Sequence, residues 1–137
     1  MKYFRFAKLV RDKIPGHMAS DNQVLFGVRK LEAPESVKEL CKKVLEETRE
    51  LADAENIESM KGEIADVQEV LDCLKKELKL EDKELSRYRE RKISKNGGFD
   101  DMIYVEYIGC EDDSKWTGYY LKNQDRYPQI NMPEDQD

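Results

Sequence analysis

Two neighbouring stretches decide the fold: residues 34–56 read PESVKELCKKVLEETRELADAEN, and residues 59–80 read SMKGEIADVQEVLDCLKKELKL. In each stretch apolar residues recur at intervals of three and four, which is the spacing of one buried face of an α-helix. The first stripe is formed by Val37, Leu40, Cys41, Val44, Leu45, Leu51 and Ala52, and the second by Met60, Ile64, Val67, Leu71, Leu74 and Leu78. The pattern predicts two amphipathic helices that pack as an antiparallel hairpin.

Acidic side chains border both apolar stripes. Glu47 and Glu50 fall at the edge of the first stripe on a helical wheel. Glu63 falls within the second stripe, and Asp66 lies at its edge. Four carboxylates in a partly dry site repel one another unless they are protonated or neutralised by cations. Because hard divalent ions prefer oxygen ligands, these residues are predicted to bind Mg²⁺, with Mn²⁺ as a substitute.

A third acidic pair has the same spacing but lies on a different side of its helix. Glu69-x-x-Asp72 has the same short spacing as the other two pairs. On the helical wheel, however, both of its side chains lie on the far side of the second helix from the apolar stripe. This pair is therefore left out of the predicted metal site.

The ordered set of motifs resembles a known family. Glu47-x-x-Glu50, twelve further residues and then Glu63-x-x-Asp66 resemble the metal-binding signature of the all-α nucleoside triphosphate pyrophosphohydrolases, the MazG-like superfamily. KLVRDKIP at 8–15 and KNGGF at 95–99 resemble its phosphoribosyl-ATP pyrophosphohydrolase-like branch. The resemblance implies a Mg²⁺-dependent enzyme that cleaves a nucleoside triphosphate between the α and β phosphates, with a housekeeping role in the nucleotide pool. Glu47 or Glu50 would then also be catalytic, by orienting or deprotonating the attacking water.

Basic residues near the motifs are candidates for binding the phosphates of a nucleotide. They are Lys8, Arg11 and Lys13 in the N-terminal motif, Lys43 one turn before Glu47, and Arg91, Lys92 and Lys95 before the glycine pair. Each has a simpler interpretation, because an exposed basic residue is often only solvated. For Lys43, a salt bridge to Glu47 is the favoured interpretation.

Two other functions remain open from the sequence. Helices with apolar stripes and bordering glutamates also occur in non-catalytic modules that bind a metal or a nucleotide, or that mediate oligomerisation. In such a module the glutamates would pair with lysine or arginine instead of clustering with one another. The third candidate is phosphoribosyl-ATP hydrolysis, which is the same reaction on another substrate.

Composition narrows the class of protein further. Charged residues make up 39% of the 137 residues and the formal net charge is −6, which argues against binding to nucleic acid polymers. No apolar run approaches the roughly 20 residues of a membrane span, and charges interrupt the apolar residues near the N-terminus. The three cysteines have no metal-binding spacing and are expected to be reduced, so a cytoplasmic location is expected.

The whole chain is predicted to be one mainly α domain over 1–137, a helical bundle with its core at 34–96. An extended or irregular arm covers 1–33, and a third helix covers about 81–94, ended by the glycines at 97–98. Alternation of apolar and polar residues predicts a β extension over 99–122, with a strand at 102–108 and a hairpin partner at 116–121. The acidic tail at 131–137 is predicted to be disordered. Because three helices cover two apolar stripes poorly, a homodimer or a larger homo-oligomer is expected.

Overall fold

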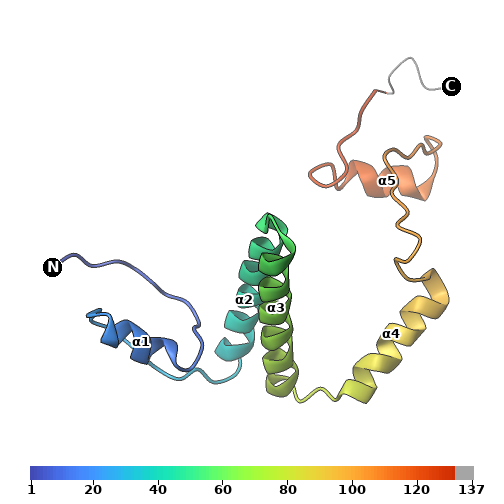
Figure 1. Cartoon of the computed structure of the whole chain (residues 1–137). Coiled ribbons are helices and arrows are strands. Elements are labelled where there is room, and N and C mark those ends of the chain that lie inside the picture. Colours follow the sequence, from blue (N-terminus) through green and yellow to red (C-terminus); the bar gives the residue numbers. More distant parts are fainter. Residues whose placement is uncertain (132–137) are drawn as a thin grey trace. The chain divides into compact units, whose positions relative to one another are not determined.

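A computed structural model describes residues 1–131, and in this range it contains five α-helices and no strand (Figure 1). The helices are α1 (Ile14–Ser20), α2 (Glu35–Asp53), α3 (Ile57–Glu77), α4 (Asp82–Asn96) and α5 (Lys115–Leu121). The predicted mainly α class is therefore confirmed. None of these helices is both long enough and apolar enough to cross a membrane. The chain separates into two compact units, one comprising Met1–Lys95 and the other beginning at Asn96, and the assignment of a single domain stays a prediction.

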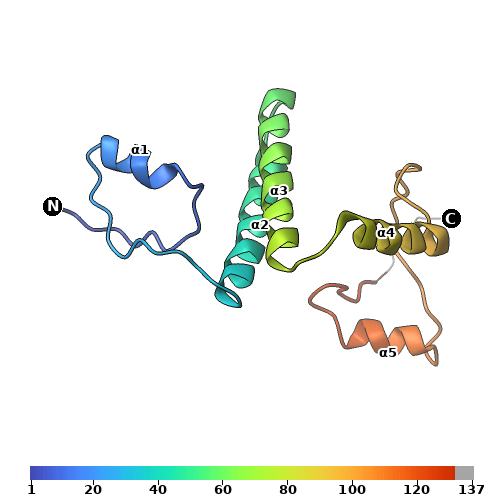
Figure 2. The same cartoon turned by 90° about the horizontal axis from the view of Figure 1, so that it is seen from below.

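The predicted helical hairpin is formed by α2 and α3, which lie side by side in both views (Figures 1 and 2). Their contact buries one apolar side chain from each helix, Leu40 and Val70. At the open end, the Ser36 hydroxyl at the start of α2 donates a hydrogen bond to the Glu77 carboxylate at the end of α3. These contacts fix the antiparallel arrangement that places residues of the two helices opposite one another.

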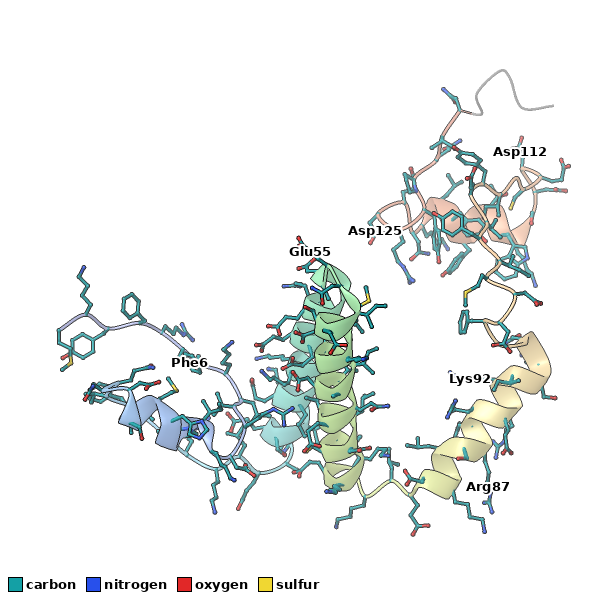
Figure 3. The ribbon with its side chains drawn as sticks, in the orientation of Figure 1. Phe6, Glu55, Arg87, Lys92, Asp112 and Asp125 are labelled. Atoms are coloured by element: carbon teal, nitrogen blue, oxygen red, sulfur yellow. The ribbon has the colours of Figure 1, made fainter. Side chains whose placement is uncertain are left out.

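The turn between α2 and α3 is short, and an asparagine caps the second helix. The side-chain oxygen of Asn56 accepts a hydrogen bond from the Ser59 amide at 2.9 Å, which satisfies one of the free N–H groups at the helix start. The helix begins at Ile57, two residues before the stretch 59–80 from which it was predicted. Glu55 marks this tip of the hairpin (Figure 3).

The arm before α2 differs from its prediction, because it contains a helix. Residues 1–11 form neither helix nor strand, but Ile14–Ser20 form α1. The arm was expected to be extended or irregular throughout residues 1–33. Pro15 instead lies in the first turn of α1, where a missing backbone N–H removes no intrahelical hydrogen bond. His17, the only histidine, lies exposed on this helix.

The third predicted helix is present as α4, and it ends where glycine permits. Asp82 and Glu84 lie in its first turn, in keeping with the helix dipole. Gly97 follows its last residue with φ of 80°, a left-handed conformation that favours glycine. Among the described helices only α2 and α3 pack closely together, so the predicted bundle is not closed within one copy of the chain.

The predicted C-terminal β-hairpin is wrong. Residues 102–108 form no strand, and their side chains are largely exposed. The expected partner strand at 116–121 is the helix α5, whose first turn is capped by the Ser114 hydroxyl accepting a hydrogen bond from the Trp116 amide at 3.2 Å. Local capping and the aromatic neighbours along the helix outweigh a strand pattern that has no partner to pair with. Of the predicted acidic tail, residues 132–137 lie outside the described part of the chain.

The unit that begins at Asn96 is organised by aromatic side chains. The rings of Trp116, Tyr119, Tyr120 and Tyr127 form a network with centroid separations of 5.1 to 6.4 Å. Edge-on and offset contacts of this kind stabilise aromatic clusters beyond the area that they bury. The cluster adds to the Ser114 cap in stabilising α5, which is only two turns long.

Candidate metal centre

Three of the four predicted acidic ligands come together on the α2–α3 hairpin. One carboxylate oxygen from each of Glu47, Glu50 and Glu63 lies within 4.8 Å of the other two. Glu47 and Glu50 are one turn apart on α2, and Glu63 projects from the facing helix α3. The antiparallel hairpin is what brings residues from the two sequence motifs to one place.

The cluster is partly removed from water. Glu47 is one of only two buried polar or charged residues in the described part of the chain, and its exposed fraction is 7%. Glu63 is half-buried, and its Oε2 atom is buried with no hydrogen-bond partner among the described residues. Glu50 is exposed. A buried carboxylate oxygen without a partner is unfavourable when it is ionised, so a bound proton or cation would stabilise it.

The electrostatics of Glu63 show the same need for a proton or a cation. Burial raises the pKa of its carboxyl group, and repulsion from Glu50, Asp66 and Glu47 raises it further. The closeness of the Glu50 carboxyl also raises the pKa of Glu63, because two neighbouring carboxyl groups are more stable when they share a proton than when both are ionised. A divalent cation would relieve the same repulsion without protonation.

Asp66, the fourth predicted ligand, is close to the cluster but has a different partner. Its Oδ1 atom accepts a hydrogen bond from Nη2 of Arg11 at 2.5 Å, and it does not belong to the group of three converging oxygens. Arg11 was predicted to bind phosphate. The structure thus places a residue of the N-terminal motif directly beside the acidic motif of α3.

A second cationic contact involves Lys43. Its Nζ atom lies 2.9 Å from the Glu47 carboxylate and 3.2 Å from that of Glu46. Burial lowers the pKa of Lys43, but hydrogen bonds to Glu47 and Glu46 outweigh that effect and raise it overall. The favoured interpretation of Lys43 as a salt-bridge partner of Glu47 matches this geometry.

Glu46 is the residue that the sequence pattern missed. Its position on the helical wheel points away from the acidic cluster, yet its carboxylate binds Lys8 at 2.9 Å as well as Lys43. These ion pairs lower the pKa of Glu46, the hydrogen bond from Lys8 being the largest cause. Glu46 therefore fastens the N-terminal arm to α2. The only sequence signal was the basic motif at 8–15, whose acidic partner cannot be read from helical spacing.

The other predicted phosphate-binding residues are not brought to the cluster. Lys13 is exposed at the start of α1, and no ion pair within residues 1–131 joins it to the acids. Arg91, Lys92 and Lys95 are exposed on α4, on which Figure 3 labels Lys92. The Arg91 guanidinium lies over the Tyr88 ring at 5.2 Å from its centroid. The structure leaves their predicted contact with nucleotide untested.

The excluded pair Glu69 and Asp72 lies apart from the cluster. Asp72 binds Lys75 at 2.8 Å, and Glu69 accepts a weak hydrogen bond from the Cys73 thiol. Neither residue is among the converging carboxylates, in keeping with their position on the far side of the helical wheel. The pair provides matched control positions on the same helix.

The donor set fits a hard divalent cation. All three converging groups are carboxylates, and none of the soft thiolate or imidazole ligands that zinc and copper prefer is among them. The unpartnered oxygen of Glu63 is a further ligand atom that a cation would neutralise.

In comparisons with known proteins, no family model, no curated protein and no solved structure matches this chain significantly.

Proposed function

We propose that this protein is a Mg²⁺-dependent nucleoside triphosphate pyrophosphohydrolase, which releases pyrophosphate and leaves a nucleoside monophosphate. The observation that carries the proposal is the convergence of Glu47, Glu50 and Glu63 across two helices, with a buried oxygen of Glu63 unpartnered. Their order and spacing with Asp66 resemble the metal-binding signature of the MazG-like superfamily. A role in housekeeping of the nucleotide pool follows from the same resemblance.

The residues of the hairpin divide into two roles in this proposal. Glu47, Glu50 and Glu63 would hold the ion, and Asp66 would join them when Arg11 moves to a phosphate group. Bound Mg²⁺ would offset the negative charge of the phosphate oxygens and lower the pKa of a coordinated water. Glu50 is the exposed member of the cluster, so its carboxylate is best suited to accept the proton of the attacking water. Glu47, which is buried and paired with Lys43, is suited to fixing the geometry.

The N-terminal arm would supply cations for the triphosphate. Arg11 and Lys8 already contact Asp66 and Glu46 beside the cluster, so a small movement of their side chains would place them on phosphate oxygens. Charge-assisted hydrogen bonds from guanidinium and ammonium groups hold phosphates strongly. Lys13, Lys43, Arg91, Lys92 and Lys95 remain further candidates for this role.

A specific observation favours a second candidate, a non-catalytic module that binds a metal or a nucleotide. Two of the four acids already have cationic partners, because Lys43 binds Glu47 and Arg11 binds Asp66. Such pairing is the arrangement expected for glutamates and aspartates at the rim of a helix interface. The unpartnered Glu63 oxygen supports metal binding in either candidate, so a test of catalysis is needed to separate them.

A homodimer or a larger homo-oligomer belongs to the same proposal. Many large apolar side chains of α2 and α3 are exposed in one copy, namely Leu45, Ile57, Met60, Ile64 and Leu71, as is Leu78 directly after α3. Contiguous exposed apolar surface is unfavourable in water and is typically covered by a partner. A second hairpin packed on this surface would complete a four-helix bundle.

The experiment that tests the function is pyrophosphate release from a panel of ordinary, deoxy and modified nucleoside triphosphates with Mg²⁺ or Mn²⁺. Glu50→Gln and Asp66→Asn remove one carboxylate charge each from the proposed site. Glu69→Gln is the matched control, because Glu69 lies on the same helix outside the cluster. The proposal expects metal-dependent release of pyrophosphate with an equal amount of monophosphate, lost in the first two variants and kept in the control.

The same experiment separates the two candidates. Binding of Mg²⁺ or nucleotide without any pyrophosphate release, by a folded sample, would support the non-catalytic module. Activity that survives both Glu50→Gln and Asp66→Asn would contradict the proposed site even if the reaction itself occurred.

A further inference from the structure

Among the described residues, two segments expose apolar side chains along a backbone that is almost free of backbone–backbone hydrogen bonds. The first is the part of the N-terminal arm that comprises residues 2–10. The second, the apolar segment, comprises residues 102–108. No backbone–backbone hydrogen bond within the described residues involves 2–10 or 103–108. Phe4 and Tyr104 are 87% and 85% exposed, which is extreme for aromatic side chains. Unpaired backbone flanked by apolar side chains is a template for strand pairing.

The two segments have opposite charge. Every charged residue from Lys2 to Arg11 is basic, and every charged residue from Asp100 to Asp113 is acidic. If the apolar segments of two copies paired with each other, their acidic residues would lie close together and would repel. The arm has the complementary charge, so it is the better partner for the apolar segment.

One antiparallel register matches the two segments residue by residue. It places Arg5 opposite Glu106, which forms a cross-strand ion pair. On the other face it places Phe4 opposite Tyr107 and Phe6 opposite Val105. Opposite charges and aromatic pairs at directly opposing positions stabilise antiparallel strands. Since side chains alternate between the faces, this register gives one wholly apolar face around these four residues.

The backbone sets the length of this match. Ala7 and Met102 have φ values of 44° and 50°, in the left-handed region that interrupts a strand. The register therefore covers residues 3–6 and 105–108, and it leaves the anchors of the arm at Lys8 and Arg11 in place.

We propose that the N-terminal arm of one copy pairs as an antiparallel β-strand with the apolar segment of a second copy. A twofold axis would repeat the pair, so that each copy gives its arm and receives its partner's. A second copy is the preferred occupant because the homo-oligomer proposed above would also cover the exposed apolar side chains of α2 and α3, and the inference rests on that part of the proposed function. This inference concerns assembly and is independent of catalytic activity.

Disulfide trapping between separately made variants tests the proposal. In a background with Cys41, Cys73 and Cys110 replaced by alanine, one preparation carries Phe4→Cys and the other carries Tyr107→Cys. After mixing and mild oxidation, a disulfide-linked heterodimer is expected on a non-reducing gel. A mixture of Phe4→Cys with Glu106→Cys is the control, because the adjacent position faces the other side of the strand. Far-UV circular dichroism establishes that each variant keeps its helices.

Two results would overturn the proposal. One is the absence of the heterodimer from the first mixture. The other is a monomeric internal disulfide in a chain that carries both Phe4→Cys and Tyr107→Cys, together with no heterodimer, because the arm would then pair within its own chain.

Charge reversal gives an independent readout in the unmodified cysteine background. Arg5→Glu and Glu106→Arg should each weaken dimerisation by about tenfold, since an attraction becomes a repulsion at two symmetric places. The double variant should restore the dimer, as measured by sedimentation over a concentration series. Failure of the double variant to restore it contradicts the proposed register.

Discussion

Arg11 donates a hydrogen bond from Nη2 to Oδ1 of Asp66 at 2.5 Å, although the two residues are 55 positions apart in the sequence. The contact joins the basic motif of the N-terminal arm to the acidic motif of α3. Both side chains are partly exposed, so the pair contributes little to the stability of the fold. Its importance lies in competition, because in the proposed enzyme Asp66 binds a metal ion and Arg11 binds phosphate.

Replacement of Arg11 by glutamine is expected to strengthen Mg²⁺ binding and weaken nucleotide binding. Removal of the guanidinium frees Asp66 from its cation, and an exposed ion pair of this kind corresponds to about a two- to fivefold change in affinity. Isothermal titration calorimetry measures the affinity for Mg²⁺. In the pyrophosphate-release assay, the KM for the nucleoside triphosphate should rise. Lys61→Gln, which removes an exposed ion pair with Glu58 elsewhere on α3, should change neither quantity. Unchanged affinity for Mg²⁺ in Arg11→Gln would show that Arg11 and the metal ion do not compete for Asp66.

Part of the acidic cluster could be predicted from the sequence. Helical spacing selected Glu47, Glu50, Glu63 and Asp66 and rejected Glu69, because the side on which a helical residue lies depends only on its position along the helix. The first three converge in the structure, whereas Asp66 pairs with Arg11. The partners of Asp66 and Glu46 were not predictable in this way. Arg11 and Lys8, which pair with Asp66 and Glu46, come from an arm segment without regular structure, and such a segment has no periodicity from which its contacts could be derived.

The raised pKa of Glu63 leads to a prediction about stability and pH. Because the folded-state pKa lies above its ordinary value near 4.5, the folded protein binds a proton more tightly than the unfolded chain does. The contribution of Glu63 is therefore least unfavourable below pH 4.5, and stability is lost as the pH rises from there through the raised pKa. Glu63→Gln cannot lose a proton, so the variant should gain stability relative to the wild type across this window.

Urea unfolding of the metal-free protein at a series of pH values measures this difference. Saturating Mg²⁺ should reduce or reverse the advantage of Glu63→Gln, because the ion compensates the charge that the wild-type carboxylate carries. Glu69→Gln serves as the comparison from outside the cluster. A difference between wild type and Glu63→Gln that does not vary with pH would mean that Glu63 is not the group responsible.

Two leucines of α2 separate the core of one copy from a surface that a second copy would cover. Leu40 is buried against α3, so Leu40→Ala should cost about 2–3 kcal/mol in the free energy of unfolding. Leu45 is 66% exposed in a single copy, and Leu45→Ala should then cost less than about 0.5 kcal/mol in a monomer. Chemical denaturation at low and high protein concentration measures both values. If the proposed bundle forms, the effect of Leu45→Ala should grow with concentration, whereas a constant small effect would indicate that no partner covers this face.

The fold was predictable where one helix packs on another and unpredictable where a segment lacks a partner. The stripes containing Leu40 and Val70 specify the α2–α3 hairpin, since each helix must bury its apolar face. At 102–108 the same kind of argument predicted a strand, but a strand also needs a neighbouring backbone, and none is provided within this unit. At 116–121 the spacing of Trp116, Tyr119 and Tyr120 suits a helix as well as a strand hairpin, and the decisive signal was the cap at Ser114.

Removal of this cap tests whether α5 depends on it. Ser114→Ala eliminates the hydrogen bond from the Trp116 amide to the serine hydroxyl, which should cost the helix about 1 kcal/mol. Because α5 spans only seven residues, that loss should visibly lower the helical Cα chemical shifts of Trp116 to Leu121 in NMR spectra. Ser86→Ala, at an exposed position inside α4, should leave these shifts unchanged. Strand-like shifts at 116–121 in the wild-type protein would restore the hairpin in place of α5. Helical shifts that persist in Ser114→Ala would instead assign the stability of α5 to its aromatic cluster alone.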